Sequence, residues 1–163
     1  MRTHPAESLR SVIRDAIART VGAVGLLGIA LIHTIDAPSH FVGGPDTWLG
    51  VAYVGLIVSC VIFAAGLIFV GDRRIWLAAG GVVVTTLIGF TLSRVAGLPG
   101  DSGDIGNWGE ALGIASVFVE GSFLMLTAGV LGYRVPESAH AVGARAMSTA
   151  PERAPRNLAP VAG

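Results

Sequence analysis

Lysine is absent from the chain, and its eleven basic residues are all arginines, which balance eleven acidic residues. With a formal net charge of zero, the sequence has no positive surplus to neutralise phosphates, which argues against a nucleic-acid-binding protein. Cysteine occurs only once, as Cys60, so a disulfide scaffold is excluded. Charged residues make up only 13% of the chain, against ~25% in an average soluble domain. This shortage points to a membrane protein.

Long apolar runs supply much of the hydrophobic content, which is 52% of the 163 residues. A helix rises about 1.5 Å per residue, so ~20 apolar residues cross a bilayer core of ~30 Å. No run alternates with a period of two, which argues against barrel strands. We therefore predict an all-α fold, a polytopic membrane protein built as a four-transmembrane-helix bundle. Its predicted spans are Ala16–Ile35, Leu49–Val70, Ile75–Ser93 and Ala111–Leu131.

The positions of the arginines predict the orientation. Every arginine except Arg94 lies before or at the start of the first span, between the second and third, or after the fourth. By the positive-inside rule, both termini then lie in the cytoplasm and the protein lies in the plasma (inner) membrane. The first run could also be a signal peptide. However, Ile35 occupies a position where cleavage needs a small residue, so we interpret the run as an uncleaved span.

Two segments flank the predicted transmembrane domain, which covers residues 16–133. Leu9, Val12, Ile13 and Ile17 recur at helical spacing, which predicts an N-terminal amphipathic helix on the inner membrane surface, with 1–15 as its cytoplasmic segment. The tail 134–163 is rich in Ala, Pro, Ser and Arg, which predicts a disordered cytoplasmic segment. Within the spans, small residues recur on single helix faces and favour close packing, with a homodimer through a leftover stripe as an alternative.

A first group of polar residues follows the first span. His33, Asp36 and His40 are spaced at i, i+3 and i+7, so one helical face could present them to a divalent metal such as zinc. Pro38 weakens this prediction, because a helix should kink or end near it. The alternative is structural: a hydrogen-bonded His33, a capping Asp36 and a solvated His40.

A second group lies between the third and fourth spans. Arg94 could grip an anionic group of a substrate, or it could form a structural salt bridge with one of four acids, Asp36, Asp101, Asp104 or Glu110. Glu120 lies ten residues beyond Glu110, about 15 Å deeper in the membrane. A charged acid at that depth costs about 2.5–3.5 kcal/mol, which makes Glu120 a candidate proton carrier or cation ligand. A protonated Glu120 that only holds helices together is the alternative.

Several segments resemble a family of small four-span membrane proteins from high-GC actinobacteria. They are LIHTIDAPSHF (31–41), LSRVAGLPG (92–100), DIGNW (104–108) and ASVFVEG (115–121), and the resemblance covers about residues 20–132. The activity of this family is uncharacterised, so the resemblance implies a fold and a location but no activity. The polar signature that it implies falls on His33, Asp36, His40, Arg94, Asp104, Asn107, Glu110 and Glu120.

Three functional hypotheses remain open. The leading one is an outward-facing polar pocket that binds a cation or small ligand, with transport as one use, formed by His33, Asp36, His40, Arg94, Asp104, Glu110 and Glu120. The second is a scaffold or partner subunit, in contact with lipid and with a membrane partner protein. The third is an oxidoreductase acting on quinone or lipid, which only His33 near the interface supports. The lack of GxSxG, CxxC, HExxH and P-loop motifs favours a protein that is not an enzyme.

Overall fold

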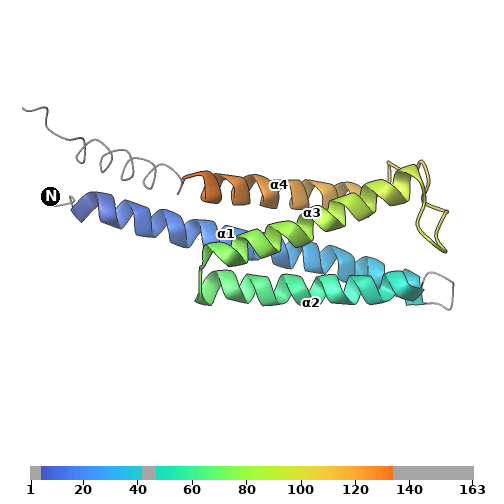
Figure 1. The fold of residues 1–163 in the computed structure, drawn as a ribbon, viewed down its shortest axis with the longest axis horizontal. Coiled ribbons are helices and arrows are strands. Elements are labelled where there is room, and N and C mark those ends of the chain that lie inside the picture. Colours follow the sequence, from blue (N-terminus) through green and yellow to red (C-terminus); the bar gives the residue numbers. More distant parts are fainter. Residues whose placement is uncertain (1–4, 42–46, 134–163) are drawn as a thin grey trace, which may run out of the picture. The chain divides into compact units, whose positions relative to one another are not determined.

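The computed structural model describes residues 5–41 and 47–133. Its elements are α1 (Pro5–Asp36), the 3-10 helix η1 (Ala37–Phe41), α2 (Thr47–Phe69), α3 (Arg73–Val95) and α4 (Ala111–Tyr133) (Figure 1). Residues 1–131 form one compact unit, and of the second unit, 132–163, only the end of α4 is described. The predicted disordered tail therefore lies outside the described residues.

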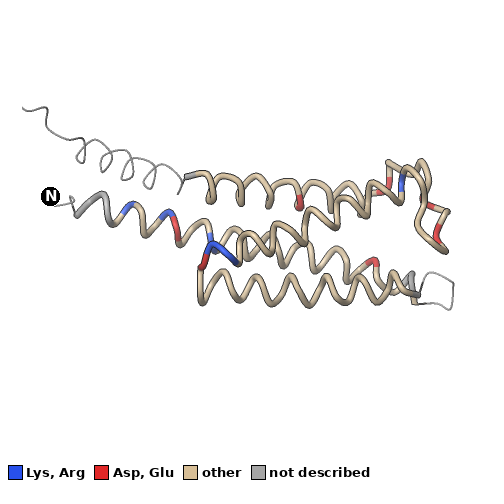
Figure 2. Tube along the Cα trace, in the orientation of Figure 1, with Lys and Arg blue, Asp and Glu red and all other residues tan. Residues whose placement is uncertain are grey.

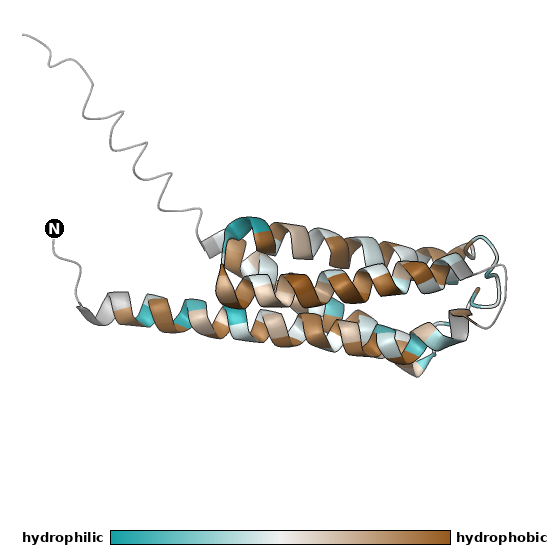
Figure 3. Ribbon diagram, turned by 90° about the horizontal axis from the view of Figure 1, so that it is seen from below, coloured by the Kyte–Doolittle hydropathy of each residue, from teal (hydrophilic) through white to brown (hydrophobic). Residues whose placement is uncertain are grey.

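Four helices are long and apolar enough to cross a membrane. The candidate spans are Leu9–Asp36, Trp48–Phe69, Arg73–Val95 and Ala111–Gly132, which confirms the predicted all-α fold with four spans. Large apolar side chains cover the outside of this bundle; Phe69 is 84% exposed, Phe118 73% and Met125 79%. Figure 3 shows hydrophobic segments along much of the length of the helices. Such a surface suits lipid rather than water, so the chain is a multi-pass membrane protein.

The N-terminal prediction differs from the structure in one respect. Leu9, Val12 and Ile13 are exposed, but they lie on α1 itself, which runs unbroken from Pro5 to Asp36. Because no proline or glycine interrupts residues 6–21, nothing in this stretch ends one helix and starts another. The described residues therefore contain no separate N-terminal amphipathic helix.

The end of the bundle where α2 meets α3 is called the turn end and comprises residues 70–72. Gly71 has φ +65° and its N–H donates to Gly66 O at 3.0 Å, which closes α2. Asp72 then caps α3 by accepting from Arg74 N at 3.1 Å. The side chain of Arg19 lies over Gly71 and pairs with Asp15. Figure 2 shows the basic segments of α1 and α3 near this end.

The opposite end, residues 96–110, is called the loop end. Gly97 adopts φ +77° and donates to Leu92 O at 3.1 Å, which ends α3. Leu98 and Asp101 then exchange two backbone hydrogen bonds of 2.8 Å across Pro99 and Gly100. Gly100 has φ +84°, as the third position of a type II turn requires. Figure 2 shows that most of the acidic segments lie toward this end.

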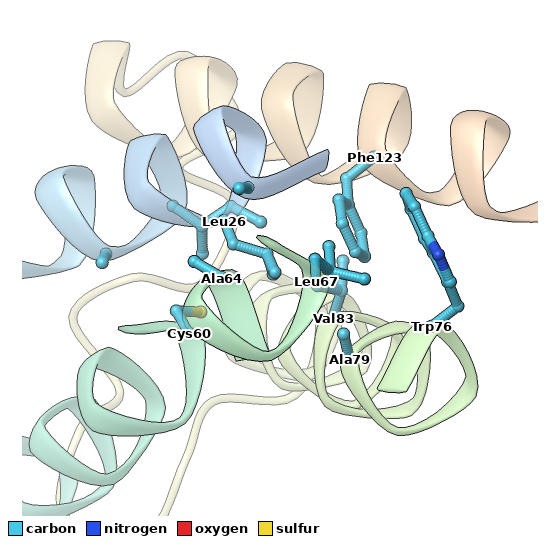
Figure 4. Packing of buried hydrophobic residues seen from close by; sticks show 11 residues of the cluster. Leu26, Cys60, Ala64, Leu67, Trp76, Ala79, Val83 and Phe123 are labelled. Carbon is cyan, nitrogen blue, oxygen red and sulfur yellow. The ribbon is translucent and has the colours of Figure 1, made fainter. Parts of the chain in front are cut away.

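The closely packed core occupies the half of the bundle nearer the turn end (Figure 4). Trp76 is fully buried, and its ring stacks on that of Phe123 with centroids 6.0 Å apart. Lipid gives helices little hydrophobic reason to associate, so such close packing holds the bundle together. The core consists of Ala23, Leu26, Ile29 and Ala30 from α1, Cys60, Ala64 and Leu67 from α2, Trp76, Ala79 and Val83 from α3, and Phe123 from α4.

The small residues of the spans serve two purposes. Gly22 lies directly against Trp76, and Gly25 lies against Phe123, so small residues on α1 make room for the two large core rings. On α3, by contrast, a Cβ at Gly81 or Gly89 would meet nothing within 4 Å. Gly81 and Gly89 therefore face open space, whereas Gly80 lies against Thr127 of α4.

We expect the substitution Gly22→Ala to destabilise the bundle by about 1–3 kcal/mol, as overpacking of a tight core does. The added Cβ would lie 2.6 Å from Trp76 Cη2 and 3.1 Å from Leu67 Cδ1, and both neighbours are fully buried. The measurement is the thermal unfolding midpoint in detergent. Gly129→Ala is the control, because its Cβ meets nothing within 4 Å. Equal midpoints for the two variants would contradict this packing.

Candidate functional site

A cavity of about 950 Å³ lies between the four helices in the half of the bundle nearer the loop end. It extends from Asp101 and Asp104 in the loop to Ser116 and Glu120 on α4. Apolar side chains such as Leu56 and small ones on α3 form much of its wall. The glycines of α3 that face open space therefore shape this cavity.

Arg94 organises the mouth of the cavity. Its side chain is 4% exposed and pairs with both Asp104 and Glu110, whose side chains are about one-third exposed. The guanidinium also lies over the ring of Phe90, with its central carbon 4.9 Å from the centroid. Its backbone carbonyl accepts a hydrogen bond from Gly106 N at 2.9 Å. The positive charge of Arg94 is thus already used to fix the loop, which leaves it little capacity to grip an anionic ligand.

Two contacts connect α2 with other parts of the chain around the cavity. Trp48 Nε1 donates to Pro99 O at 2.7 Å, which links the start of α2 to the α3–α4 loop. Tyr53 donates its hydroxyl hydrogen to Asp36 Oδ2 at 2.9 Å, which links α2 to the end of α1. Both side chains line the cavity. These contacts hold the polar wall of the cavity on α1 and α2.

Glu120 lies at the bottom of the cavity and is 1% exposed. Its Oε1 accepts a hydrogen bond of 2.8 Å from Ser116 Oγ, one helical turn earlier on α4. The hydroxyls of Ser59 and Thr85, on the neighbouring helices α2 and α3, donate to Gly55 O and Gly81 O of their own helices. Glu120 therefore accepts its hydrogen bond from its own helix and otherwise borders the cavity.

His33 faces Glu120 from α1 and is 6% exposed. Its Nδ1 lies 2.9 Å from Ile29 O, and its Nε2 lies 4.0 Å from Glu120 Oε1. The ring also lies against that of Tyr53, with centroids 5.1 Å apart. An imidazole and a carboxyl group thus meet near the middle of the bundle, next to open space.

The structure brings together six of the seven residues proposed for the pocket. The lining of the cavity includes His33, Asp36, Arg94, Asp104, Glu110 and Glu120. The seventh, His40, lies in η1, and its side chain is outside the described part of the chain. Sequence reasoning missed Tyr53 as part of the site. Its phenolic hydroxyl within an apolar run was the signal that could have found it.

The proposed metal site gains no support from the described side chains. Among them, no group of three or more His, Cys, Asp or Glu residues is placed to hold a metal ion. The α-helix ends at Asp36, two residues before Pro38, so the single α-helical face expected for His33, Asp36 and His40 does not continue through His40. With the side chain of His40 outside the described residues, this trio stays a prediction.

The formal charges around the cavity are unbalanced. The charged residues that line it are Asp36, Asp101, Asp104, Glu110 and Glu120 on the acidic side and Arg94 on the basic side. Protein walls focus such a field more strongly than open water does, because they have a low dielectric constant. Among the described residues, the arrangement therefore favours a cation over an anion.

Comparison with known proteins identifies no relative: no family model, curated protein or solved structure matches the chain.

Proposed function

We propose that the protein binds a small cationic ligand in the cavity between its four helices. The observation that carries this proposal is the placement of Glu120 and His33, both over nine-tenths buried, beside about 950 Å³ of space. Ionisable groups are expensive within a membrane, and they face cavities or partners where they occur. A purely structural role for Glu120 would need a close partner on another helix. Among the described residues, the nearest ionisable group on another helix is the imidazole of His33, whose Nε2 lies 4.0 Å from Glu120 Oε1.

The excess of acidic residues supports a cation as the ligand. Asp101 and Asp104 lie along the path from the loop end toward Glu120. The single positive charge of Arg94 offsets only part of the combined negative charge of Asp101, Asp104 and Glu110. A cation entering at the loop end meets negative charge first and a buried carboxyl group last. The volume falls within the ~300–1,000 Å³ typical of small-molecule sites, which is far more than a bare ion needs.

We further propose that the loop end faces the outside of the cell. The arginines at the turn end favour a cytoplasmic location for that end, the N-terminal segment 1–15 and the tail 134–163. The exposed apolar residues on the first part of α1, such as Leu9 and Val12, would then lie at the inner membrane surface. The cavity would therefore take its ligand from the outside.

Binding is tested with the full chain purified gently in detergent and screened against single metal ions and single organic cations. At 100 times its Kd, a bound cation stabilises the folded state by about 2.7 kcal/mol and raises the unfolding temperature. We expect at least one cation to stabilise the wild type and to lose its effect in Glu120→Gln. Ser122→Ala is the control on α4, since Ser122 is exposed and its hydroxyl donates to Phe118 O of the same helix.

Two results would overturn this proposal. The first is a folded wild-type protein that no cation stabilises. The second is a folded Glu120→Gln variant that every stabilising cation protects as well as it protects the wild type. Mass spectrometry of molecules that co-purify with the wild type complements the screen, because a bound cation would identify the ligand directly.

A further inference from the structure

We infer that the ligand is an amphipathic amine, whose N–H groups bond to Glu120 and His33 and whose apolar body fills the cavity. The inference rests on the proposed function and names the class of cation. It depends on which atoms at the bottom of the cavity can donate hydrogen bonds and which can only accept them.

His33 presents an acceptor to the cavity. A carbonyl oxygen can only accept a hydrogen bond, so the 2.9 Å contact with Ile29 O requires the hydrogen on His33 Nδ1. In a neutral imidazole the other nitrogen, Nε2, then carries a lone pair. Among the described residues, no donor lies within hydrogen-bond distance of Nε2, and its 4.0 Å separation from Glu120 Oε1 is too long for a hydrogen bond. An acceptor on a residue that lines the cavity is therefore left for a ligand.

Glu120 presents a second acceptor next to the first. Ser116 donates to Oε1, but within the described part of the chain no residue donates to Oε2. The bottom of the cavity thus holds a carboxylate and an imidazole acceptor with no donor between them. Both groups line the cavity, so the site suits a ligand that brings hydrogen-bond donors and positive charge.

An ammonium group meets both requirements. His33 Nε2 and Glu120 Oε1 lie 4.0 Å apart, and Oε1 can accept a second hydrogen bond beside the one from Ser116. A nitrogen about 2.8 Å from both atoms sees them at an angle of about 90°, not far from the tetrahedral angle between its N–H bonds. A quaternary ammonium has no N–H to donate. A metal ion would find no group of three ligating side chains among the described residues. The geometry therefore favours a primary or secondary amine over both.

The rest of the cavity suits an apolar group attached to that amine. Leu49 and Leu56 of α2, Val82 and Phe90 of α3, and Leu112 of α4 line it. A hydrated inorganic ion would leave these walls in contact with water, whereas an apolar body buries them at a gain of about 25 cal/mol per Å². Polar groups at one end and apolar walls around the rest match a molecule with a charged head and an apolar body.

The test compares three probes with one apolar body: 2-phenylethylamine, its N,N,N-trimethyl derivative and 2-phenylethanol. Binding to the full chain in lipid nanodiscs is measured by equilibrium dialysis, with empty nanodiscs to correct for partition into lipid. We expect the amine to bind at least ten-fold more tightly than either other probe. Glu120→Gln and His33→Phe should each weaken amine binding about ten-fold, and Ser122→Ala should leave it unchanged.

The outcomes separate this inference from the proposed function. Equal binding of the amine and the trimethyl derivative would overturn the role of the N–H donors and leave cation binding intact. Failure of all three probes, with another cation still stabilising the wild type through Glu120, would overturn the amine and keep the proposed function. If no cation acts through Glu120, both proposals fall. The comparison of probes uses the wild type, so it remains decisive even if a variant does not fold.

Discussion

Replacing Arg94 by glutamine is expected to destabilise the protein by about 3 kcal/mol, the lower end of the cost of breaking a buried ion pair. The guanidinium is 4% exposed and joins Asp104, Glu110 and the face of Phe90. Without it, two carboxylates would repel each other at the mouth of the cavity. Their one-third exposure lets water reach them, which is why the lower end of the range applies. Thermal and denaturant unfolding in detergent measure the loss.

Two further variants test whether the charge of Arg94 is the cause. Arg94→Lys keeps the charge but cannot bond to both carboxylates in the same planar geometry, so it should recover part of the stability. Glu110→Gln added to Arg94→Gln removes one of the repelling charges, so the double variant should be more stable than the sum of the single effects. Arg74→Gln, at an exposed position in the first turn of α3, is the control. An Arg94→Gln protein as stable as this control would refute the role of Arg94 in holding the loop.

The fold was largely predictable because hydropathy alone marks membrane spans. The predicted starts and ends of the four spans agree with the helices to within a few residues, except that α1 begins at Pro5 instead of Ala16. Residues 5–15 include charged side chains, so an argument from hydropathy excludes them and starts the span at Ala16. The helix itself continues, because Arg10 and Arg14 are as compatible with helical backbone as the apolar residues around them.

The candidate site was predictable in its membership but not in its contacts. Polar residues in or next to apolar runs stand out, which is why His33, Glu120 and Arg94 were identified. Their contacts depend on the rotation of each helix about its own axis. The 3.6-residue period identifies a face, but it does not show which neighbour that face meets. The small residues of α3 illustrate this limit, since the same stripe that predicts close packing borders the cavity.

The division of the bundle into a packed half and a hollow half follows from where the large rings lie. Trp76 and Phe123 fill the space between the helices near the turn end. Toward the loop end, α3 offers Gly81, Thr85 and Gly89 around the cavity instead. The packed core and the proposed ligand site therefore use different residues of the same helices. Core variants can therefore be studied without replacing a residue that lines the proposed site.

Replacing Trp76 by alanine is expected to cost about 3 kcal/mol, the lower end of the range for large aromatic residues in cores. Lipid is itself apolar, so the loss comes mainly from the contacts with Phe123 and Gly22 and from the cavity that remains. Trp76→Phe should cost about 1 kcal/mol, because most of the apolar volume is kept. It also breaks no hydrogen bond within the described residues, where the indole N–H has no partner. Chemical denaturation in detergent measures both losses.

The contact with Gly22 provides an internal check on this prediction. The clash expected from Gly22→Ala involves Cη2 and Cζ3 of Trp76, atoms of the six-membered ring that a phenylalanine would not place there. Gly22→Ala combined with Trp76→Phe should therefore be more stable than the sum of the two single losses, with a coupling of about 1 kcal/mol. Strict additivity would show that the two residues do not meet in the folded protein. In that case the packed half of the bundle would be arranged differently from the structure described.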